Sequence, residues 1–240
     1  MRLEGDAFKA WADRVYQQGP MASWTAISKE VGITRGTLMM QKAKNAVDPR
    51  AVLAFARAND CDPVRELSSF RGFALLRQRF AAPDDSELLT QIAVADLFDE
   101  ISARTEERQG PRQPLAPWGA PPYALAMWFA HSGGMDYNRR VREVLGISDT
   151  ATAKKIHQGQ FGVDQIVPVC EAMGMNPLLG LLILGYITEE EAALGGGLRE
   201  SALARARADA LSDQLQQSVR YIRRRLQLAD RVDEAITMLS

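Results

Sequence analysis

One pattern occurs twice in this chain at an offset of 114 residues, and that repeat limits the possible folds more than any other feature. At this offset Gly32-Ile33-Thr34 aligns with Gly146-Ile147-Ser148, and Cys61-Asp62-Pro63-Val64 aligns with Met175-Asn176-Pro177-Leu178 without a gap. Further aligned residues are Ala10, Ala12, Gly19, Met21, Ala58 and Leu67 with Ala124, Ala126, Gly133, Met135, Ala172 and Leu181. Because one offset aligns glycines, a proline and apolar positions together, the sequence indicates two copies of one small helical domain.

The first copy has the spacing of a bundle of about five short helices. Apolar residues three and four apart predict a first helix over Asp6–Gln17, which should end at Gly19-Pro20. Asp48-Pro49 and Asp62-Pro63 predict the starts of a fourth and a fifth helix. In both dipeptides Asp is a good N-cap, and Pro fits the first helical position because its missing N–H would have no partner there.

The second and third helices are predicted to be joined by a sharp turn. Ser23 is expected to cap the second helix, and Gly32 to end it, because glycine accepts the left-handed backbone of such a turn. Thr34 is expected to cap the third helix, with Leu38 facing the core. In the second copy Thr152 takes the place of Leu38. That helix is therefore expected either to be shifted by one residue or to pack more loosely.

Bulk composition fits an ordinary globular protein, with 46% hydrophobic and 25% charged residues and a formal net charge of -1. The charge argues against attraction of the whole molecule to nucleic acid, but basic residues gather at the two repeat centres. These are Lys29, Arg35, Lys42, Lys44 and Arg50 in the first copy, and Arg139, Arg140, Arg142, Lys154 and Lys155 in the second. Two interpretations stay open: phosphate contacts, or a solvated helix face.

Several classes of site and protein are not indicated. Cys61 and Cys170 lie at different positions of the repeat, and with the scattered His131 and His157 they lack metal-ligand spacing. We therefore expect no disulfide, metal or cofactor, and no enzyme, because no phosphate-binding glycine loop or activated nucleophile is present. We also expect a cytoplasmic protein with no signal segment, in which the apolar run Leu178–Ile187 forms a buried helix.

The run Ile27-Ser28-x-x-Val31-Gly32-Ile33-Thr34-Arg35-x-Thr37-Leu38, followed by Leu53-Ala54-Phe55-Ala56 and Cys61-Asp62-Pro63, resembles a known family. It is similar to the lambda-repressor-like (Cro and phage-repressor type) helix-turn-helix regulators over Phe8–Phe70 and, more weakly, over Pro122–Ile187. The tandem arrangement also resembles actinobacteriophage immunity repressors. The resemblance implies a sequence-specific transcriptional regulator of double-stranded DNA, most simply a repressor, with no small-molecule ligand and no membrane partner.

In this family the third helix enters the major groove with its N-terminal residues at the base edges. The resemblance therefore implies that the base readers of the first copy are Thr34, Arg35, Gly36 and Met40, and that its backbone anchors are Thr37, Lys42, Lys44 and Asn45. In the second copy the corresponding readers are Ser148, Asp149, Thr150 and Lys154, flanked by Lys155, His157 and Gln158 as anchors. The alternative for each is an ordinary surface side chain.

The expected fold is all-α, with two lambda-repressor-like helix-turn-helix bundles in tandem, a connecting helix and a long C-terminal helix. The predicted segments are a first helix-turn-helix domain (1–82), a connecting helix and proline-rich linker (83–121), a second helix-turn-helix-like domain (122–194), and a glycine hinge with the C-terminal helix (195–240). The connecting helix, over Asp84–Arg108, is expected to pack on the first copy.

The C-terminal helix, predicted from Leu198 onward, carries apolar residues in heptad spacing. These residues are Leu215, Val219, Ile222, Leu226, Ala229 and Ile236. They predict either self-association through a coiled coil or packing of the helix on the second copy.

A different function also fits the sequence. In this alternative the protein is an adaptor that docks a protein partner through its second helix-turn-helix copy, the Leu178–Ile187 segment and the C-terminal helix. A duplicated helix-turn-helix can lose DNA binding and become such a docking surface.

Overall fold

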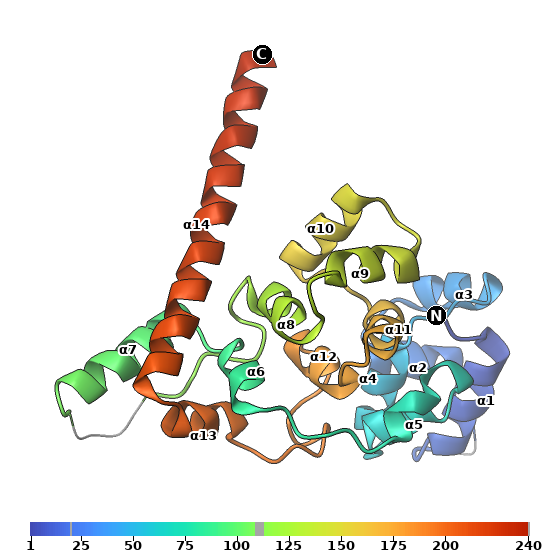
Figure 1. The fold of residues 1–240 in the computed structure, drawn as a ribbon. Coiled ribbons are helices and arrows are strands. Elements are labelled where there is room, and N and C mark those ends of the chain that lie inside the picture. The colour runs from blue at the N-terminus through green and yellow to red at the C-terminus, as the bar shows by residue number, and fades with distance from the viewer. Residues whose placement is uncertain (20, 109–112, 240) are drawn as a thin grey trace. The chain divides into compact units, whose positions relative to one another are not determined.

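The computed structural model describes residues 1–19, 21–108 and 113–239, with side chains as far as residue 227. Figure 1 shows the helical architecture of the chain. The described part contains fourteen α-helices and one 3-10 helix, and its only β-type pairing is an isolated bridge between Leu3 and Val47. The all-α prediction is confirmed, as is a long helix at the C-terminus. Pro20 and residues 109–112 of the predicted linker lie outside the described residues.

The chain divides into two compact units, each assembled from three separate segments. Unit 1 consists of Met1–Ala82, Asn138–Thr152 and Phe161–Gly196, and unit 2 consists of Pro83–Tyr137, Ala153–Gln160 and Gly197–Ser240. Predicted segments 1–82 and 83–121 therefore fall in different units, whereas predicted segment 122–194 contributes residues to both.

The first copy of the repeat begins unit 1. Its elements are α1 (Gly5–Val15), α2 (Trp24–Val31), α3 (Arg35–Ala43), α4 (Arg50–Ala58), α5 (Pro63–Ser68) and the 3-10 helix η1 (Arg71–Arg77). The five predicted helices are confirmed, and η1 is an addition that the sequence pattern did not predict. The core contains the fully buried side chains of Phe8, Leu38, Phe55 and Phe73, with Trp11 3% exposed. Removing these side chains from water is the main stabilising contribution to such a bundle.

The second copy supplies α9 (Tyr137–Leu145), α10 (Asp149–Gln158), α11 (Val163–Met173) and α12 (Pro177–Ile183). Asn176 caps α12 ahead of Pro177, just as Asp62 caps α5 ahead of Pro63, so the predicted helix start at Asp62-Pro63 is confirmed. At Asp48-Pro49 the helix begins one residue later than predicted, because Pro49 is the N-cap of α4 and Arg50 is its first residue. The predicted burial of the Leu178–Ile187 run is also confirmed, since most of its large side chains are at most 4% exposed. No helix in the described part of the chain is long and apolar enough to cross a membrane.

Unit 2 is built from α6 (Asp85–Leu89), α7 (Val94–Thr105), α8 (Ala124–Ser132), α13 (Leu198–Arg205) and α14 (Ala208–Leu239). One of its cores joins side chains from α6, α7, α13 and α14 with Ile92. Two predictions are wrong here. The segment Asp84–Arg108 forms two helices instead of one, and these pack with α13 and α14 in unit 2 instead of on the first copy.

The predicted helix from Leu198 is also interrupted, because Ala206 has an extended backbone between α13 and α14. The guanidinium of Arg104 donates hydrogen bonds to the carbonyl oxygens of Leu203 at 2.7 Å and Ala206 at 2.6 Å. These carbonyls have no intrahelical partner at the end of a helix, so Arg104 stabilises the break. The break in turn allows Leu203 and Leu211 to enter the same core.

The apolar residues of α14 have different surroundings along the helix. Leu215 packs against the core of unit 2, whereas Val219 is 47% and Leu226 is 61% exposed. The side chains of Ala229 and Ile236 lie outside the described residues. Leu215 is therefore not available for the predicted coiled coil, because it already packs against a core.

Candidate nucleic-acid interface

The turn between α2 and α3 has the local geometry that the sequence predicts. The Ser23 hydroxyl accepts a hydrogen bond from the backbone N–H of Ala26 at 3.0 Å and so caps α2. Gly32 ends α2 with φ +73°, where any side chain would be strained. The Thr34 hydroxyl then accepts from the N–H of Thr37 at 3.1 Å and caps α3. Three local signals thus fix the direction in which α3 leaves the turn.

Helix α3 has one buried side and one exposed side. Leu38 has no exposed surface and holds the helix to the core, as predicted. Arg35 and Gly36 are exposed at the N-terminal end, and Met40 is 51% exposed one turn further on. Arg35 has no ion pair or hydrogen bond to any residue in the described part of the chain. The predicted readers of the first copy therefore lie at the surface, and the Arg35 guanidinium keeps its donors available.

The predicted anchors of the first copy differ in the contacts that their side chains already make within the chain. Lys42 places its ammonium 5.1 Å from the centre of the Trp24 ring and 3.9 Å from the Asp6 carboxylate. The Thr37 hydroxyl shares a 2.9 Å hydrogen bond with that of Thr34. Lys44, by contrast, is exposed at the C-terminal end of α3. Lys44 is thus better placed than Lys42 to contact a phosphate.

Asn45 has a structural contact within the first copy. Its side-chain oxygen accepts a hydrogen bond from the backbone N–H of Gly5 at 2.7 Å, and its own backbone has φ +49°. The role of Asn45 as a DNA anchor stays a prediction. What the structure shows is that its side chain connects the end of α3 to α1.

The third helix of the second copy keeps the register of the first. Helix α10 begins at Asp149, the equivalent of Arg35, so of the two expected alternatives the one-residue shift does not occur. Thr152 occupies the place of Leu38 and is 1% exposed. Its hydroxyl donates to the carbonyl oxygen of Ser148 at 2.9 Å, which satisfies the polar group in a buried position.

The two copies also share three left-handed backbone positions. The pairs at the 114-residue offset are Gly32 (φ +73°) with Gly146 (+63°), Asn45 (+49°) with Gly159 (+62°), and Asp60 (+51°) with Gly174 (+68°). Only the position of Gly32 was predicted from the sequence to have a left-handed backbone. The other two pairs could also have been predicted from the sequence, because Asn and Asp are the non-glycine residues that adopt this conformation most readily.

In α10 several predicted site residues contact their own chain. Asp149 accepts from Arg142 at 2.9 Å, and the Lys155 ammonium donates to the carbonyl oxygen of Gln160 at 2.5 Å. Thr150, Lys154 and Gln158 are exposed. The polar side chains of α10 are therefore less available to a ligand than those of α3. The guanidinium of Arg142 also compensates the charge of Asp149, which would otherwise repel phosphate.

His157 is partly buried and contacts Tyr221 of α14. Its Nδ1 and the Tyr221 hydroxyl form a hydrogen bond, and the two ring centres are 5.4 Å apart. Burial, followed by the positive charge of Arg225, lowers the pKa of His157 below its usual 6.5. Burial raises the pKa of Tyr221 to about 12, so the phenol keeps its proton. At neutral pH His157 is thus uncharged, which argues against its predicted role as a phosphate anchor.

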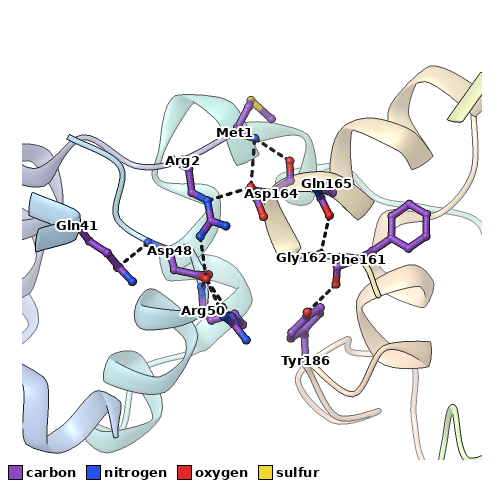
Figure 2. A network of polar contacts seen from close by, with 10 residues as sticks. All are labelled: Met1, Arg2, Gln41, Asp48, Arg50, Phe161, Gly162, Asp164, Gln165 and Tyr186. Carbon is purple, nitrogen blue, oxygen red and sulfur yellow. Dashed lines mark hydrogen bonds and ion pairs between the residues drawn. The ribbon is translucent and has the colours of Figure 1, made fainter. Parts of the chain in front are cut away.

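An ion-pair network in unit 1 was not predicted from the sequence (Figure 2). The Asp48 carboxylate accepts from the N–H of Arg50 at 3.0 Å, and it also pairs with the guanidinium groups of Arg50 at 2.8 Å and Arg2 at 2.7 Å. Arg2 also reaches Asp164 at 3.1 Å. Burial alone would raise the pKa of Asp48, but the hydrogen bonds from Arg50 and Arg2 outweigh it, and the net pKa is lowered. Asp48 is therefore charged at neutral pH.

This network bears on the position of α3. The backbone N–H of Asp48 donates to the side-chain oxygen of Gln41, a residue of α3, at 3.1 Å. Gln41 thus links α3 to the start of α4, where Arg50 and Arg2 hold Asp48. Helix α3 is thus held at both ends, by the Thr34 cap at its N-terminus and by the Gln41 hydrogen bond near its C-terminus.

Comparisons with known proteins give no match: no family model, no curated protein and no solved structure matches the chain. The resemblance to lambda-repressor-like regulators therefore stays a prediction from the sequence. Within the described residues no group of three or more His, Cys, Asp or Glu side chains could hold a metal ion.

Proposed function

We propose that the protein is a sequence-specific transcriptional regulator, a repressor of the phage or prophage immunity type, that reads double-stranded DNA with α3. The main support for the proposal is the exposure, the free guanidinium and the position of Arg35. This side chain is exposed, unpaired within the described residues, and located at the first position of a helix whose direction is fixed by Gly32 and Thr34. A base-reading side chain needs this combination of a free donor group and a rigid support.

The chemistry of α3 fits the edge of a base pair. The planar guanidinium of Arg35 can donate two hydrogen bonds to guanine O6 and N7, a pairing that contributes about 1–3 kcal/mol of discrimination. Beside it, a Cβ atom added to Gly36 would meet only the Thr34 hydroxyl, at 3.9 Å. The helix surface next to Arg35 is thus low enough for the DNA backbone or a base edge to approach closely.

The test begins with selection of binding sites from random duplex DNA, followed by affinity measurements for the selected and a scrambled duplex. Arg35→Ala should lower affinity for the selected duplex and leave affinity for the scrambled one nearly unchanged. Lys44→Ala should weaken both alike and reduce the salt dependence of binding. Arg65→Ala removes an exposed arginine on α5 and should change neither. An equal loss on both duplexes for Arg35→Ala would refute the reader assignment.

The second copy supports an extension of the proposal. Helix α10 starts at the residue equivalent to the start of α3, and its first residues, Asp149 and Thr150, differ chemically from Arg35 and Gly36. If both helices read DNA, the preferred site is asymmetric, because each helix prefers different bases. A footprint that covers two adjacent major-groove faces, of which one is lost with Thr150→Ala and Lys154→Ala together, supports this extension.

A second candidate function is favoured by the contacts of α10. Because Asp149, Lys155 and His157 are each bound by another part of the chain, α10 has fewer free polar groups than α3. This fits the adaptor alternative, in which the second copy docks a protein. A footprint confined to the site read by α3, unchanged in the Thr150→Ala and Lys154→Ala double variant, would favour that alternative.

A further inference from the structure

A cavity of about 320 Å³ lies in unit 1 beside the proposed reading helix. It is bordered by the end of α2, the turn to α3, one residue of α3, helix α4 and the segment around Tyr186. Its volume falls within the ~300–1,000 Å³ typical of small-molecule sites, and is about twice that of an engineered cavity that binds benzene. None of the residues proposed to read DNA lines it, so its role is a separate question.

One part of the cavity lining is apolar. Val31 and Ile33 come from α2 and the turn, and Leu53 and Ala54 come from α4. Leu53 is 2% exposed and forms part of the core, so this side of the cavity is rigid. An apolar molecular body would be removed from water against these side chains, which favours binding by the hydrophobic effect.

The polar part of the lining offers donors. Gln41 uses its side-chain oxygen to accept from Asp48, and no described residue accepts a hydrogen bond from its amide nitrogen. Arg50 and Arg57 use Nε and Nη2 for their carboxylate partners, and no hydrogen bond within the described residues involves their Nη1 atoms. Three side chains on the border of the cavity thus keep N–H groups for a ligand.

Asp48, which lines the cavity, and Glu191 both form ion pairs with arginines. Asp48 accepts from Arg50 and pairs with Arg2, as described above. Glu191 accepts from Arg57 Nε at 2.6 Å and Nη2 at 2.7 Å. Because these acceptors are occupied, the hydrogen-bonding capacity that remains is that of cationic and neutral donors. Such a set is complementary to a carboxylate and not to an amine or another donor.

We propose that this cavity binds a small carboxylic acid with an apolar body, whose carboxylate accepts from Arg50, Arg57 and Gln41. The apolar body lies against Ile33, Leu53 and Ala54. The ligand would thus contact both the α2–α3 turn and α4.

The proposal can be tested by calorimetry with naphthoate, which has an aromatic body of suitable size and one carboxylate. Naphthoate should bind with one-to-one stoichiometry, and the neutral isostere naphthamide should bind about tenfold more weakly or not at all. Ala54→Phe fills the cavity from α4 and should abolish naphthoate binding. Ala58→Phe, which adds the same side chain at an exposed position of α4, is the matched control and should bind normally.

The location is tested in the unchanged protein by methyl NMR, which does not depend on a variant that folds. Naphthoate should shift the methyl signals of Ile33 and Leu53 and leave those of Leu67 and Leu203 unchanged. The proposal is overturned if naphthoate does not bind, if naphthamide binds equally well, or if the shifted methyl groups lie elsewhere. None of these results bears on DNA binding, so the two proposals fail separately.

Discussion

The side chain of Asn45 and the backbone of Gly5 are joined by a 2.7 Å hydrogen bond that connects the end of α3 to the first residue of α1. The same two helices approach so closely that a Cβ atom on Gly5 would lie 2.9 Å from Cγ of Lys42. The position of α3 therefore depends on side chains at its C-terminal end as well as on the turn before it.

Replacement of Asn45 by Ala should destabilise the protein by about 1–3 kcal/mol, because it removes this hydrogen bond and places Ala at φ +49°. Asn45→Gly loses the hydrogen bond but relaxes the backbone, so it should cost less. Urea unfolding measures both. A larger cost for Gly than for Ala would contradict the assigned backbone conformation.

Gly32 is expected to tolerate substitution poorly for a purely conformational reason. A Cβ atom there would meet nothing within 4 Å, so the cost of Gly32→Ala is the left-handed strain of about 1–2 kcal/mol. Gly196 is an appropriate control, because its Cβ would also meet nothing but its φ is not in the left-handed region. Thermal unfolding should therefore separate Gly32→Ala from Gly196→Ala, and equal melting temperatures would show that strain at Gly32 is negligible.

The Arg57–Glu191 pair should make the stability of the protein depend on pH. Two hydrogen bonds from Arg57 lower the pKa of Glu191 below its ordinary 4.5. A carboxyl with a lowered folded pKa stabilises the protein above its unfolded pKa and loses this contribution as pH falls through the folded pKa. Glu191→Gln should therefore be less stable than the wild type near neutral pH, with a difference that shrinks below about pH 4.5.

The control for this prediction is Glu190→Gln, which changes an exposed carboxyl next to Glu191 in sequence. Urea unfolding over a series of pH values should show no comparable effect for Glu190→Gln. A Glu191→Gln difference that stays constant down to acidic pH would mean that the Arg57 pair contributes no pH-dependent stability.

His157 should titrate below its usual 6.5, because burial and then Arg225 disfavour the charged ring. Arg225→Gln should raise this pKa, whereas Arg223→Gln, an exposed arginine on the same helix, should leave it unchanged. NMR titration of the ring protons measures all three values. Since the folded pKa is the lower one, the protein should lose stability as pH falls from 6.5 through the folded pKa. A wild-type value above 6.5 would contradict the buried contact with Tyr221.

Local signals made the turn between α2 and α3 predictable. Ser23, Gly32 and Thr34 act within one turn of the chain, so their roles follow from residue type and spacing alone. The exposure of Arg35 and Met40 follows from the same helical period once Leu38 is assigned to the core.

What the sequence could not show depends on distant partners. The break at Ala206 is stabilised by Arg104, about a hundred residues earlier, and the contact of His157 comes from Tyr221 on another helix. A period-based prediction contains no information about such pairs. For the same reason the predicted anchors could be located on their helices but not sorted into free and bound side chains.

The three left-handed pairs have a consequence for the ancestry of the chain. Between the copies, Asn45 aligns with a glycine, and so does Asp60, although no side-chain chemistry is shared at either position. After a gene duplication, substitutions at such sites are restricted to the few residue types that accept this backbone, whereas the backbone places no such restriction on Arg35 and Asp149. If the two copies descend from one ancestor, as the repeat predicts, their common origin is preserved better in these backbone conformations than in the residues that would contact a ligand. Distant relatives of this chain should be sought by the spacing of Gly, Asn and Asp at these three points.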